Sequence, residues 1–410
     1  MTIQIVRNTV AADRSAHPRQ TILSLEGAQA ALAEISTWPG YEVTPMRELT
    51  PVSEACRVRS VFYKDEASRF GLSSFKALGG TYAVARLLQR RVSEQLGRAV
   101  STVELASGAH SAITRTLTVV SATDGNHGRA VAAGAAMFGC SSVILIHSGV
   151  SAAREQAIAA RGAHVIRIDG NYDDSVRAAA HMAIQDGWAL IADTSSDGGE
   201  AACVDVMHGY TVMVAEALDQ ISALGSEQPS HIFVQGGVGG LAAAACAYTW
   251  LSLAESAPIV IVVEPELADC LYQSAKAGIP TPSTGNLDTV MAGLSCGEVS
   301  EYAWHILREG AEFFQLISDD EAIAAMRLLA DEDRAGAPIV AGESAGAGLA
   351  GFMAAAADPQ TRRALRLDPA SRILLFGTEG ATDPELYATL LGRPATDDGA
   401  APASPAITKG

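Results

Sequence analysis

The sequence predicts an α/β protein in which parallel strands are covered by helices. Short runs rich in valine, isoleucine and leucine alternate with alanine-rich helical segments along most of the 410 residues. Strands of this kind, separated by helices, are typical of parallel sheets buried on both faces. Hydrophobic residues make up 48% of the chain and charged residues 18%, which indicates a large ordered interior. The chain is too long for one compact core, so two or more domain-sized units are expected.

The expected elements alternate regularly in the first half of the chain. Apolar runs bounded by polar or glycine residues predict strands, and longer alanine-rich runs predict helices. The expected strands are 61–64, 117–122, 142–147, 164–168 and 188–192, and the expected helices are 75–91, 125–138, 152–161 and 174–186. Residues 92–115 lack a clear period and are predicted to form a linker or surface excursion.

The second half continues the strand series with runs at 231–235, 258–263 and 372–376. The tail after Pro394 is low in hydrophobic residues and rich in proline and alanine, so it is predicted to be disordered. We expect a larger domain formed by residues 1–84 and 187–394 and a smaller α/β domain formed by residues 85–186. Residues 395–410 would form the tail.

Composition narrows the possible partners and location. The net charge of −17 argues against nucleic acid or an anionic membrane, because both need a basic surface. No run of about 18 apolar residues would span a membrane, and no signal peptide is recognised. The six cysteines form no CxxC pair or metal-site spacing, so no metal is expected and a reducing cytoplasm is predicted. A regulated disulfide between Cys270 and Cys296 is an alternative to free thiols.

Lys76 stands at the start of an apolar helical pattern, between Phe75 and Ala77. A lysine in such surroundings loses hydration, so we expect its pKa to fall. The neutral amine can then attack a carbonyl to form a Schiff base, and pyridoxal phosphate is the usual carbonyl partner. A lysine that extends along the helix to reach solvent is the alternative interpretation.

The run GGVGG at residues 236–240 joins the expected strand 231–235 to an alanine-rich helix. Glycines let the backbone approach an anion closely, and the first N–H groups of a helix favour negative charge. This pattern predicts a phosphate site, although a tight turn without a ligand is possible. The next strand ends at Glu264, where NAD-binding folds carry an acid for the ribose, so an NAD-dependent dehydrogenase is a remote alternative. The glycine run does not keep the GxGxxG spacing, and a dehydrogenase would leave Lys76 without a role.

Several segments together resemble the fold type II pyridoxal phosphate enzymes (the tryptophan synthase β-like group), and most closely the diaminopropionate ammonia-lyase family. They occur in family order from about Tyr41 to Tyr387. The motifs are KDE at 64–66, RFGLSSFKALGG at 69–80, ATDGNHG at 122–128, DT at 193–194, QGGVGG at 235–240, VEP at 263–265, MAGLSCGE at 291–298, GESAG at 342–346 and GTEGATDP at 377–384. The resemblance implies two parallel-sheet α/β domains with the cofactor, pyridoxal 5'-phosphate, between them.

The resemblance also implies a role for each residue of these motifs. Lys76 would form the Schiff base with the cofactor and later carry a proton, and Phe75 would pack near the ring. Asn126 would donate a hydrogen bond to the phenolic oxygen, and Thr378 would meet the pyridine nitrogen with a neutral hydroxyl. The phosphate would be held by Gly236, Gly237, Val238, Gly239 and Gly240. Taken alone, Asn126 and His127 could equally be a helix cap and a hydrogen-bonded histidine.

Asp124 and Asp193 bear on which reaction of the family is expected. Threonine dehydratases usually have a small neutral residue where Asp124 stands. A carboxylate near the substrate α- and β-carbons can remove the α-hydrogen or attract a cationic β-substituent. The family reaction implied is α,β-elimination from 2,3-diaminopropionate, a small amino-acid substrate, to pyruvate and two ammonia. Either aspartate could instead cap a helix N-terminus.

Three departures from the family keep other substrates open. Residues 195–202 (SSDGGEAA) replace a segment that is usually aromatic after Asp193, Ser73 stands where many relatives have asparagine, and His208 stands where glutamine is frequent. The alternatives are a dehydratase of a 3-hydroxy amino acid (threonine, serine or 3-hydroxyaspartate type) and an eliminase of another β-substituted alanine. The family resemblance further implies a homodimer.

Overall fold

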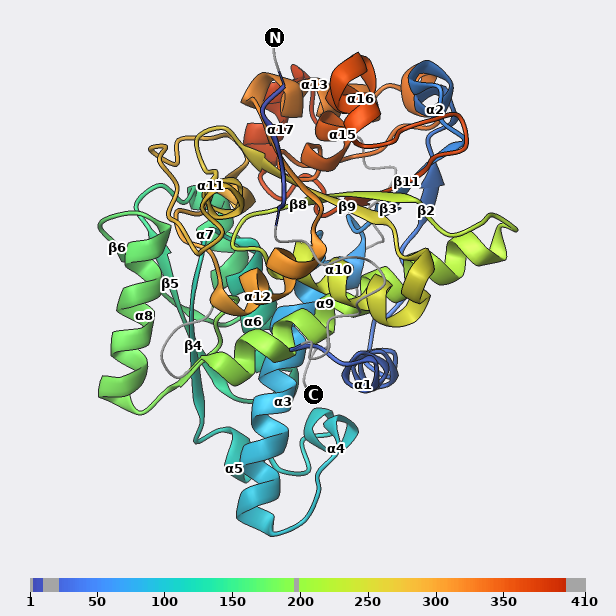
Figure 1. Ribbon diagram of the computed structural model, residues 1–410. Helices are drawn as coiled ribbons and strands as arrows, with labels where there is room; N and C mark the ends of the chain where they lie inside the picture. The colour runs from blue at the N-terminus through green and yellow to red at the C-terminus, as the bar shows by residue number, and fades with distance from the viewer. Residues whose placement is uncertain (1–2, 10–21, 195–198, 396–410) are drawn as a thin grey trace.

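The computed structural model describes residues 3–9, 22–194 and 199–395, which form two sheets surrounded by helices (Figure 1). The larger sheet has seven strands in the order β1-β10-β9-β8-β11-β3-β2. Its strands are β1 (Ile5–Arg7), β2 (Met46–Glu48), β3 (Ser60–Asp65), β8 (His231–Gln235), β9 (Ile259–Pro265), β10 (Phe313–Ile317) and β11 (Arg372–Gly377). The inner neighbours pair in parallel, whereas β1 and β2 pair antiparallel at the two edges.

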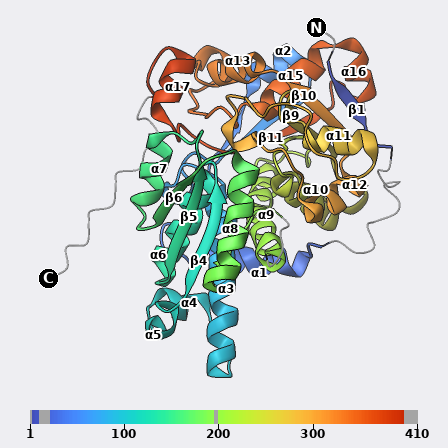
Figure 2. The same cartoon turned by 90° about the vertical axis from the view of Figure 1, so that its left-hand side faces the viewer.

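The smaller sheet has four parallel strands in the order β6-β5-β4-β7. These are β4 (Thr118–Thr123), β5 (Ser141–His147), β6 (His164–Ile168) and β7 (Ala189–Leu190). Figure 2 shows this sheet standing beside and below the seven-stranded one, with α8 across one of its faces. The α/β class with two predominantly parallel sheets is therefore confirmed. The domain boundaries at 84/85 and 186/187 stay a prediction, and β7 begins just beyond the second of them.

Helices connect the strands and cover the sheets. They are α1 (Leu25–Ile35), α2 (Thr50–Cys56), α3 (Lys76–Leu96), α4 (Thr102–Ala106), α5 (Ser111–Thr114), α6 (Asn126–Phe138), α7 (Ala152–Ala159), α8 (Tyr172–Asp186), α9 (Glu200–Ala223), α10 (Gly240–Leu253), α11 (Cys270–Ala277), α12 (Glu301–Gly310), α13 (Asp319–Leu329), α14 (Glu332–Ala335), α15 (Ala347–Ala357), α16 (Pro359–Ala364) and α17 (Pro384–Leu391), with short 3-10 turns η1 (Arg69–Gly71), η2 (Ala254–Ser256) and η3 (Ala292–Leu294). The largest buried cluster joins α3, α6, α9 and α10, where small residues such as Ala243 allow close packing.

Three sequence expectations need correction. Residues 92–115 are not a plain linker, because α3 continues to Leu96 and α4 and α5 follow it. The capping box of Ser101 and Glu104, which starts α4, was the local signal for structure there. The edge strands β1 and β2 were not expected, since three residues are too few to establish a period. The interior strand β10 was also missed, because Gln315 interrupts its apolar run, although that side chain is buried.

A buried charge cluster supports the segment that precedes α3. It comprises Lys64 of β3, Glu66, Arg69 of η1 and Glu216 of α9, all at most 5% exposed. The Arg69 guanidinium binds Glu66 Oε2 at 2.8 Å and Glu216 Oε2 at 2.7 Å, while Lys64 Nζ lies 2.7 Å from Glu216 Oε2. Each charge thus has an oppositely charged partner, the condition under which buried ions are tolerated.

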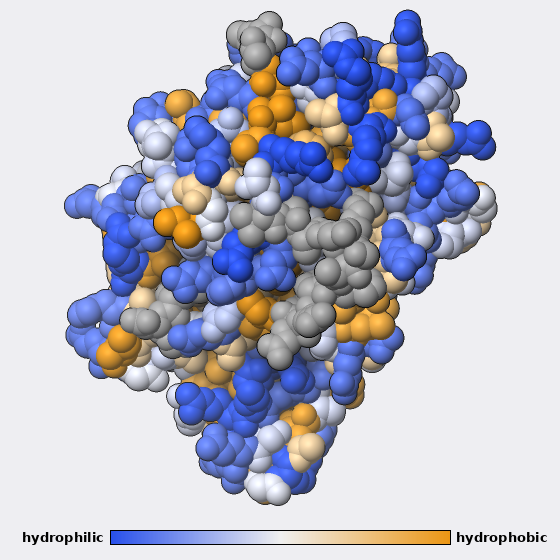
Figure 3. All heavy atoms as spheres, viewed as in Figure 1, coloured by the Kyte–Doolittle hydropathy of each residue, from blue (hydrophilic) through white to orange (hydrophobic). Residues whose placement is uncertain are grey.

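The face of the molecule seen in Figure 3 is mainly hydrophilic. Figure 3 shows charged and polar residues over most of one face, with apolar residues gathered in small areas. Among the described residues, no helix combines the length and apolar character needed to cross a membrane. The predicted tail lies outside the described residues apart from residue 395.

Candidate active site

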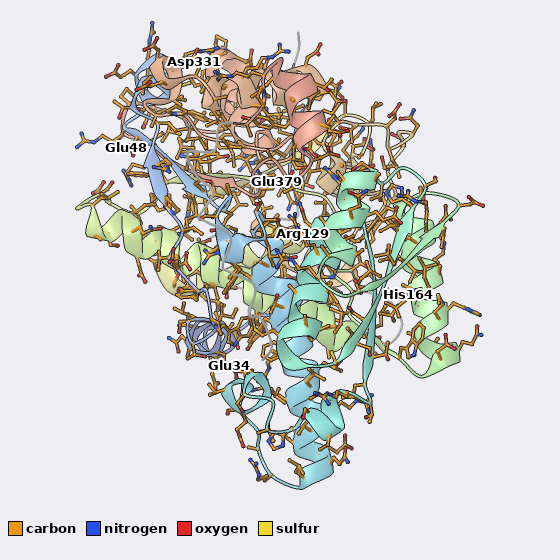
Figure 4. The ribbon with its side chains drawn as sticks, turned by 180° about the vertical axis from the view of Figure 1, so that it is seen from behind. Glu34, Glu48, Arg129, His164, Asp331 and Glu379 are labelled. Carbon is orange, nitrogen blue, oxygen red and sulfur yellow. The ribbon has the colours of Figure 1, made fainter. Side chains whose placement is uncertain are left out.

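A pocket of about 750 Å³, counting its open mouth, lies at the junction of the two sheets. Its walls include the loops at the carboxyl ends of β4, β8 and β11 and residues of α3, α6, α8, α9 and α10. The carboxyl ends of strands are where open α/β sheets usually bind ligands. Figure 4 shows Glu379, which follows β11, close to Arg129 of α6 at this junction. The pocket is lined by Ser74, Phe75, Lys76, Asp124, Asn126, His127, Tyr172, Asp193, Tyr210, Gln235, Gly236, Gly237, Val238, Gly240, Leu241, Gly293, Leu294, Ser295, Cys296, Ser344, Thr378 and Glu379.

Lys76 is the first residue of α3 and points into the pocket, with 17% of its side chain exposed. Its Nζ lies 2.5 Å from Oδ2 of Asp193, 5.7 Å from the ring centroid of Phe75 and 5.9 Å from that of Tyr210. The expected fall in its pKa is wrong for this arrangement. Burial acts to lower the pKa of Lys76, as anticipated, but Asp193, Tyr210 and Asp124 outweigh it and raise that pKa well above its ordinary value.

The segment before Lys76 is tied to the loop that follows β11. The N–H of Phe75 donates to the carbonyl of Thr378 at 3.0 Å, and the N–H of Gly380 donates to the carbonyl of Ser73 at 3.0 Å. An isolated antiparallel bridge joins Ser74 to Glu379 between these two bonds. The backbone segments that carry Lys76 and Thr378 are therefore hydrogen-bonded to each other beside the pocket.

Asp193 has a partner on each carboxylate oxygen. Oδ2 binds Lys76, and Oδ1 accepts the hydroxyl proton of Tyr172, the first residue of α8, at 2.9 Å. Nδ1 of His127 lies 3.9 Å from Oδ2. Burial would raise the pKa of Asp193, yet Lys76, His127 and the hydrogen bond from Tyr172 hold it below its ordinary value. Asp193 binds side chains of the pocket, so a helix-cap role does not account for it.

Asp124 follows β4 and lies on another wall of the pocket. The N-cap of α6 is Gly125, without a side-chain cap, so Asp124 is not the cap either. Its carbonyl accepts a hydrogen bond from Nη1 of Arg154 at 3.3 Å, and Arg154 is paired with the buried Glu343. The Oδ2 atom of Asp124 lies 3.7 Å from the position that a Cβ on Gly293 would take. Burial raises the pKa of Asp124, with Lys76 and Arg154 opposing that rise.

Asn126 is held from both ends of its amide. Its Nδ2 donates a hydrogen bond to Oε2 of Glu379, and its Oδ1 accepts from Nη2 of Arg129 at 2.9 Å. Glu379 in turn accepts the N–H of Ser344 at 3.1 Å. These contacts fix the orientation of the amide and leave its second N–H hydrogen available to a ligand in the pocket.

The glycine turn between β8 and α10 has the geometry of an anion cradle. Gly237 (φ +62°) and Gly239 (φ +100°) take backbone conformations that favour glycine, and a Cβ on Gly236 would lie 2.5 Å from Cγ of Glu264. Helix α10 begins at Gly240, so its first N–H groups face the same space. Gly236, Gly237, Val238 and Gly240 line the pocket, whereas Gly239 shapes the turn without lining it.

Glu264 is not available to a ribose. Its carboxylate accepts the N–H of Leu271 at 3.0 Å and that of Tyr272 at 2.7 Å, both in the first turn of α11. Burial raises its pKa to about 8. The acid that suggested a dehydrogenase therefore binds the N-terminus of α11, and the observation that favoured that alternative is lost.

The residues fit pyridoxal phosphate. Among the described residues, Oγ1 of Thr378 is buried without a hydrogen-bond partner, although it lines the pocket. An unpaired buried hydroxyl is costly unless a ligand completes it, and a pyridine nitrogen would do so. The same pocket holds an amine at Lys76, an aromatic ring at Phe75 and the glycine turn. This cofactor needs an amine for its aldehyde, an aromatic contact for its ring, a hydroxyl for its ring nitrogen and an anion site for its phosphate, and the pocket has all of these groups.

The alternative of a disulfide between Cys270 and Cys296 is not realised in this structure, where all six cysteines are free. Both thiols are buried, and burial raises the pKa of each well above its ordinary value. Cys296 lines the pocket, and Sγ of Cys270 lies 3.6 Å from the carbonyl oxygen of Gly237.

Sequence reasoning missed several pocket residues. Tyr172, Tyr210, Ser344 and Glu379 were given no role, although Ser344 and Glu379 lie within motifs that carried the family resemblance. For Tyr172 the signal was the capping box of Asn171 and Asp174, which fixes where α8 begins. Of the altered segment 195–202, residues 195–198 lie outside the described residues, and α9 begins at Glu200.

Comparison with known proteins agrees with this site. The family described as pyridoxal-phosphate dependent enzyme matches residues 37–378. Diaminopropionate ammonia-lyase of Salmonella typhimurium is 37% identical over 361 residues, covering 85% of this chain and 88% of that protein. The crystal structure of the Escherichia coli diaminopropionate ammonia-lyase in complex with an aminoacrylate–PLP azomethine reaction intermediate has a TM-score of 0.85 at 32% identity, covering 95% of this chain and 97% of that one. Its complex with D-serine matches with a TM-score of 0.85 at 33% identity and the same coverage of both chains.

The matched family spans most of the chain, and the ammonia-lyase relatives share its fold along nearly their whole length. The pocket supplies the groups that the cofactor of this family requires. The chain therefore belongs to the fold type II pyridoxal phosphate enzymes and, within them, to the diaminopropionate ammonia-lyase family, as a pyridoxal phosphate-dependent ammonia-lyase.

Proposed function

We propose that the chain cleaves 2,3-diaminopropionate by α,β-elimination and releases pyruvate and two ammonia. The observation that carries this proposal is the charge of the pocket, where the carboxyl groups of Asp124, Asp193 and Glu379 accompany Lys76, the one lysine among the described residues that line it. A substrate whose β-substituent is an amine brings a positive charge into these surroundings, whereas a hydroxyl does not. Similarity to diaminopropionate ammonia-lyases of two bacteria supports the same substrate.

The residues proposed to bind the cofactor act on different parts of it. When bound, pyridoxal phosphate supplies an electron-accepting ring that stabilises negative charge at the substrate α-carbon. Lys76 would hold it covalently, Asn126 would donate to its phenolic oxygen, Thr378 would meet its ring nitrogen and Phe75 would pack near the ring. The phosphate would be bound by the turn formed by Gly236, Gly237, Val238, Gly239 and Gly240 with the N-terminus of α10.

Two acids would divide the proton transfers. Asp193 carries its negative charge beside Lys76, so this pair can accept the α-hydrogen when it points toward α3. Asp124, whose pKa is raised by burial, lies on another wall, where it can accept the hydrogen of the opposite configuration or attract the cationic β-amine. Closely placed carboxyl groups with oppositely shifted pKa values commonly take different roles in this way.

The stoichiometry of the products tests the substrate. Purified enzyme is incubated with β-amino, β-hydroxy and β-chloro alanines in both configurations, and pyruvate and ammonia are measured. Two ammonia per pyruvate from diaminopropionate, released faster than from the other substrates, is the expected outcome. Preferential release of one ammonia per pyruvate from a hydroxy amino acid would contradict the proposal. Lys76→Ala should abolish the release and the visible absorption of the bound cofactor.

Replacing Asp124 distinguishes a role in proton transfer from a role in binding the cofactor. Asp124→Asn keeps the size of the side chain but removes its charge, so cofactor absorption should persist while turnover falls by about 10²–10⁴-fold on one or both enantiomers. The initial rates on D- and L-diaminopropionate measure this directly. Unchanged rates on both would remove Asp124 from the mechanism.

A second candidate is elimination from a 3-hydroxy amino acid. The E. coli ammonia-lyase has been crystallised with D-serine, a β-hydroxy amino acid, which favours including this class. The same pocket acids could protonate a hydroxyl as it leaves. The panel above distinguishes the two candidates by the number of ammonia molecules per pyruvate.

We further propose that the enzyme is a cytoplasmic homodimer whose larger domain comprises residues 1–84 and 187–394 and whose smaller domain comprises residues 85–186. The family resemblance and the free cysteines support this proposal. Light scattering coupled to gel filtration tests the dimer, because a monomeric mass at micromolar concentration would exclude it. Limited proteolysis would report whether cleavage falls near the proposed boundaries.

A further inference from the structure

Tyr172 is a buried pocket residue to which the proposed mechanism gives no task. It is 7% exposed, and its ring packs with Val238 and Cys296. The capping box of Asn171 and Asp174 places it as the first residue of α8, so its position follows from the start of that helix. Its only described side-chain hydrogen bond runs to Oδ1 of Asp193 at 2.9 Å. Burial raises the pKa of Tyr172 well above its ordinary value, so it remains a hydroxyl donor.

The geometry around Asp193 shows what this bond does. The carboxylate has one oxygen on Tyr172 and the other on Lys76 Nζ at 2.5 Å, so its plane is fixed by two partners from different helices. A third group competes for it, because Nδ1 of His127 lies 3.9 Å from Oδ2 and has no hydrogen-bond partner among the described residues. Without the hydroxyl of Tyr172, Oδ1 would be buried and unpaired, and the carboxylate could turn toward His127.

We propose that Tyr172 is a positioning residue which, by holding Oδ1 of Asp193, aims Oδ2 at Lys76 and so fixes the side from which this pair takes the α-hydrogen. The inference rests on the proposed function for its consequence in catalysis. The contact between Tyr172, Asp193 and Lys76 itself does not depend on the substrate.

The test compares two changes that each remove one buried tyrosine hydroxyl. Tyr172→Phe keeps the ring and its packing. Tyr63→Phe is the matched control, because Tyr63 is 1% exposed, does not line the pocket, and has a hydroxyl without a hydrogen-bond partner among the described residues. Both variants should fold, which thermal denaturation and the circular dichroism spectrum would verify.

The first measurement needs no substrate. The full-length chain is freed of cofactor and labelled with limiting acetic anhydride at a series of pH values, and mass spectrometry follows the peptide that contains Lys76. Since Asp193 raises the pKa of Lys76, loosening that pair in Tyr172→Phe should make Lys76 react several-fold faster near pH 8. Labelling at the wild-type rate, or more slowly, would overturn the inference. Tyr63→Phe should label like the wild type.

The second measurement uses the holoenzyme and both enantiomers of diaminopropionate. Tyr172→Phe should change the ratio of the two kcat values by about tenfold, the scale expected when a reacting group is misaligned. The hydrogen bond from Tyr172 lowers the pKa of Asp193, so the acidic limb of the pH profile should move upward on the affected enantiomer. The other titratable groups that interact electrostatically around Asp193 are Lys76 of α3, Asp124 after β4, His127 of α6, Cys203 and Tyr210 of α9, and Cys296.

The two measurements separate the possible failures. Equal losses on both enantiomers with an unmoved pH profile would mean that Tyr172 is only structural, which overturns the inference. If the wild type does not release two ammonia from diaminopropionate, the proposed function fails while the labelling result still decides the role of Tyr172.

Discussion

At the scale of single residues, Asp193 and Asp124 illustrate how one pocket gives two identical side chains different properties. Asp193 is buried and Asp124 is partly buried, and burial by itself raises a carboxyl pKa. Asp193 gains Lys76 and the Tyr172 hydroxyl at hydrogen-bond distance, and its pKa falls below the ordinary value. Asp124 receives its opposite charges from farther away, and its pKa stays raised. Position relative to one lysine therefore determines which acid is the stronger.

A second feature at this scale is backbone strain next to Lys76. Ser73 has φ +52°, a conformation that costs most residues about 1–2 kcal/mol but that asparagine adopts readily. Ser73→Asn should therefore increase the free energy of unfolding by about 0.5–1 kcal/mol, measured by urea denaturation. Ser73→Ala serves as the control, because it changes the side chain without relieving the backbone. An equal gain from both substitutions would contradict the explanation.

At the scale of elements, the turn between β8 and α10 combines a special backbone with a ligand surface. Gly237 has φ +62° and lines the pocket. Gly278, at the end of α11, has φ +75°, and no described atom lies within 4 Å of the position that a Cβ there would take. The two glycines therefore impose a similar backbone requirement in different surroundings. This pair allows the contribution of the turn to binding to be separated from its contribution to stability.

Gly237→Ala and Gly278→Ala should each lower the free energy of unfolding by about 1 kcal/mol, since alanine is disfavoured at positive φ. Only Gly237→Ala should also raise the dissociation constant for pyridoxal phosphate, by about tenfold or more, because its methyl group would occupy the cradle. Equilibrium dialysis and thermal denaturation measure the two effects. Equal affinities in the two variants would mean that the turn does not contact the phosphate.

The elements also show how far the sequence could be interpreted. The apolar runs predicted the interior strands β3, β4, β5, β8, β9 and β11 to within a residue or two, because burial on both faces demands continuous hydrophobicity. The edge strands β1 and β2 were missed because each has only three residues, whereas the longer edge strand β6 was predicted at its observed bounds.

Within the site, motifs located Lys76, Asn126 and Thr378, which all line the pocket. They could not reveal that Asp193 would reverse the pKa shift of Lys76. That effect depends on a contact between residues 117 positions apart in the sequence. Glu379 was missed for the same reason, because its partner Asn126 begins α6, which follows β4 of the other sheet.

At the scale of the whole molecule, the buried charge cluster of Lys64, Glu66, Arg69 and Glu216 links β3, the Lys76 segment and α9. Burial would raise the pKa of Glu216, but Arg69 and Lys64 hold it below its ordinary value. A lowered carboxyl pKa contributes stability that is present above the unfolded pKa of about 4.3 and is lost as the pH falls through the folded value. The cluster should therefore support the fold at neutral pH and weaken below about pH 4.

Glu216→Gln tests this contribution, because it leaves Lys64 and Arg69 short of a counter-charge. The expected loss at pH 7 is about 3–5 kcal/mol, the usual effect of breaking a buried ion pair. The difference from the wild type should shrink on acidification, as Glu216 becomes protonated. Glu227→Gln is the control, since Glu227 pairs with Arg372 but is 81% exposed and should have little effect. A loss that is independent of pH would argue against the electrostatic explanation.

The backbone bonds that join Ser73, Phe75, Thr378 and Gly380 have a consequence for motion. Lys76 and Thr378 follow the carboxyl ends of β3 and β11, which are neighbours in the seven-stranded sheet, whereas Asp124 and Asn126 follow β4 of the other sheet. A hinge movement between the sheets would leave the distance from Lys76 to Thr378 unchanged while altering the distance from either to Asp124. The attachment point and the ring-nitrogen contact would thus keep a constant separation along the cofactor, and opening for substrate exchange would displace Asp124 rather than the ring.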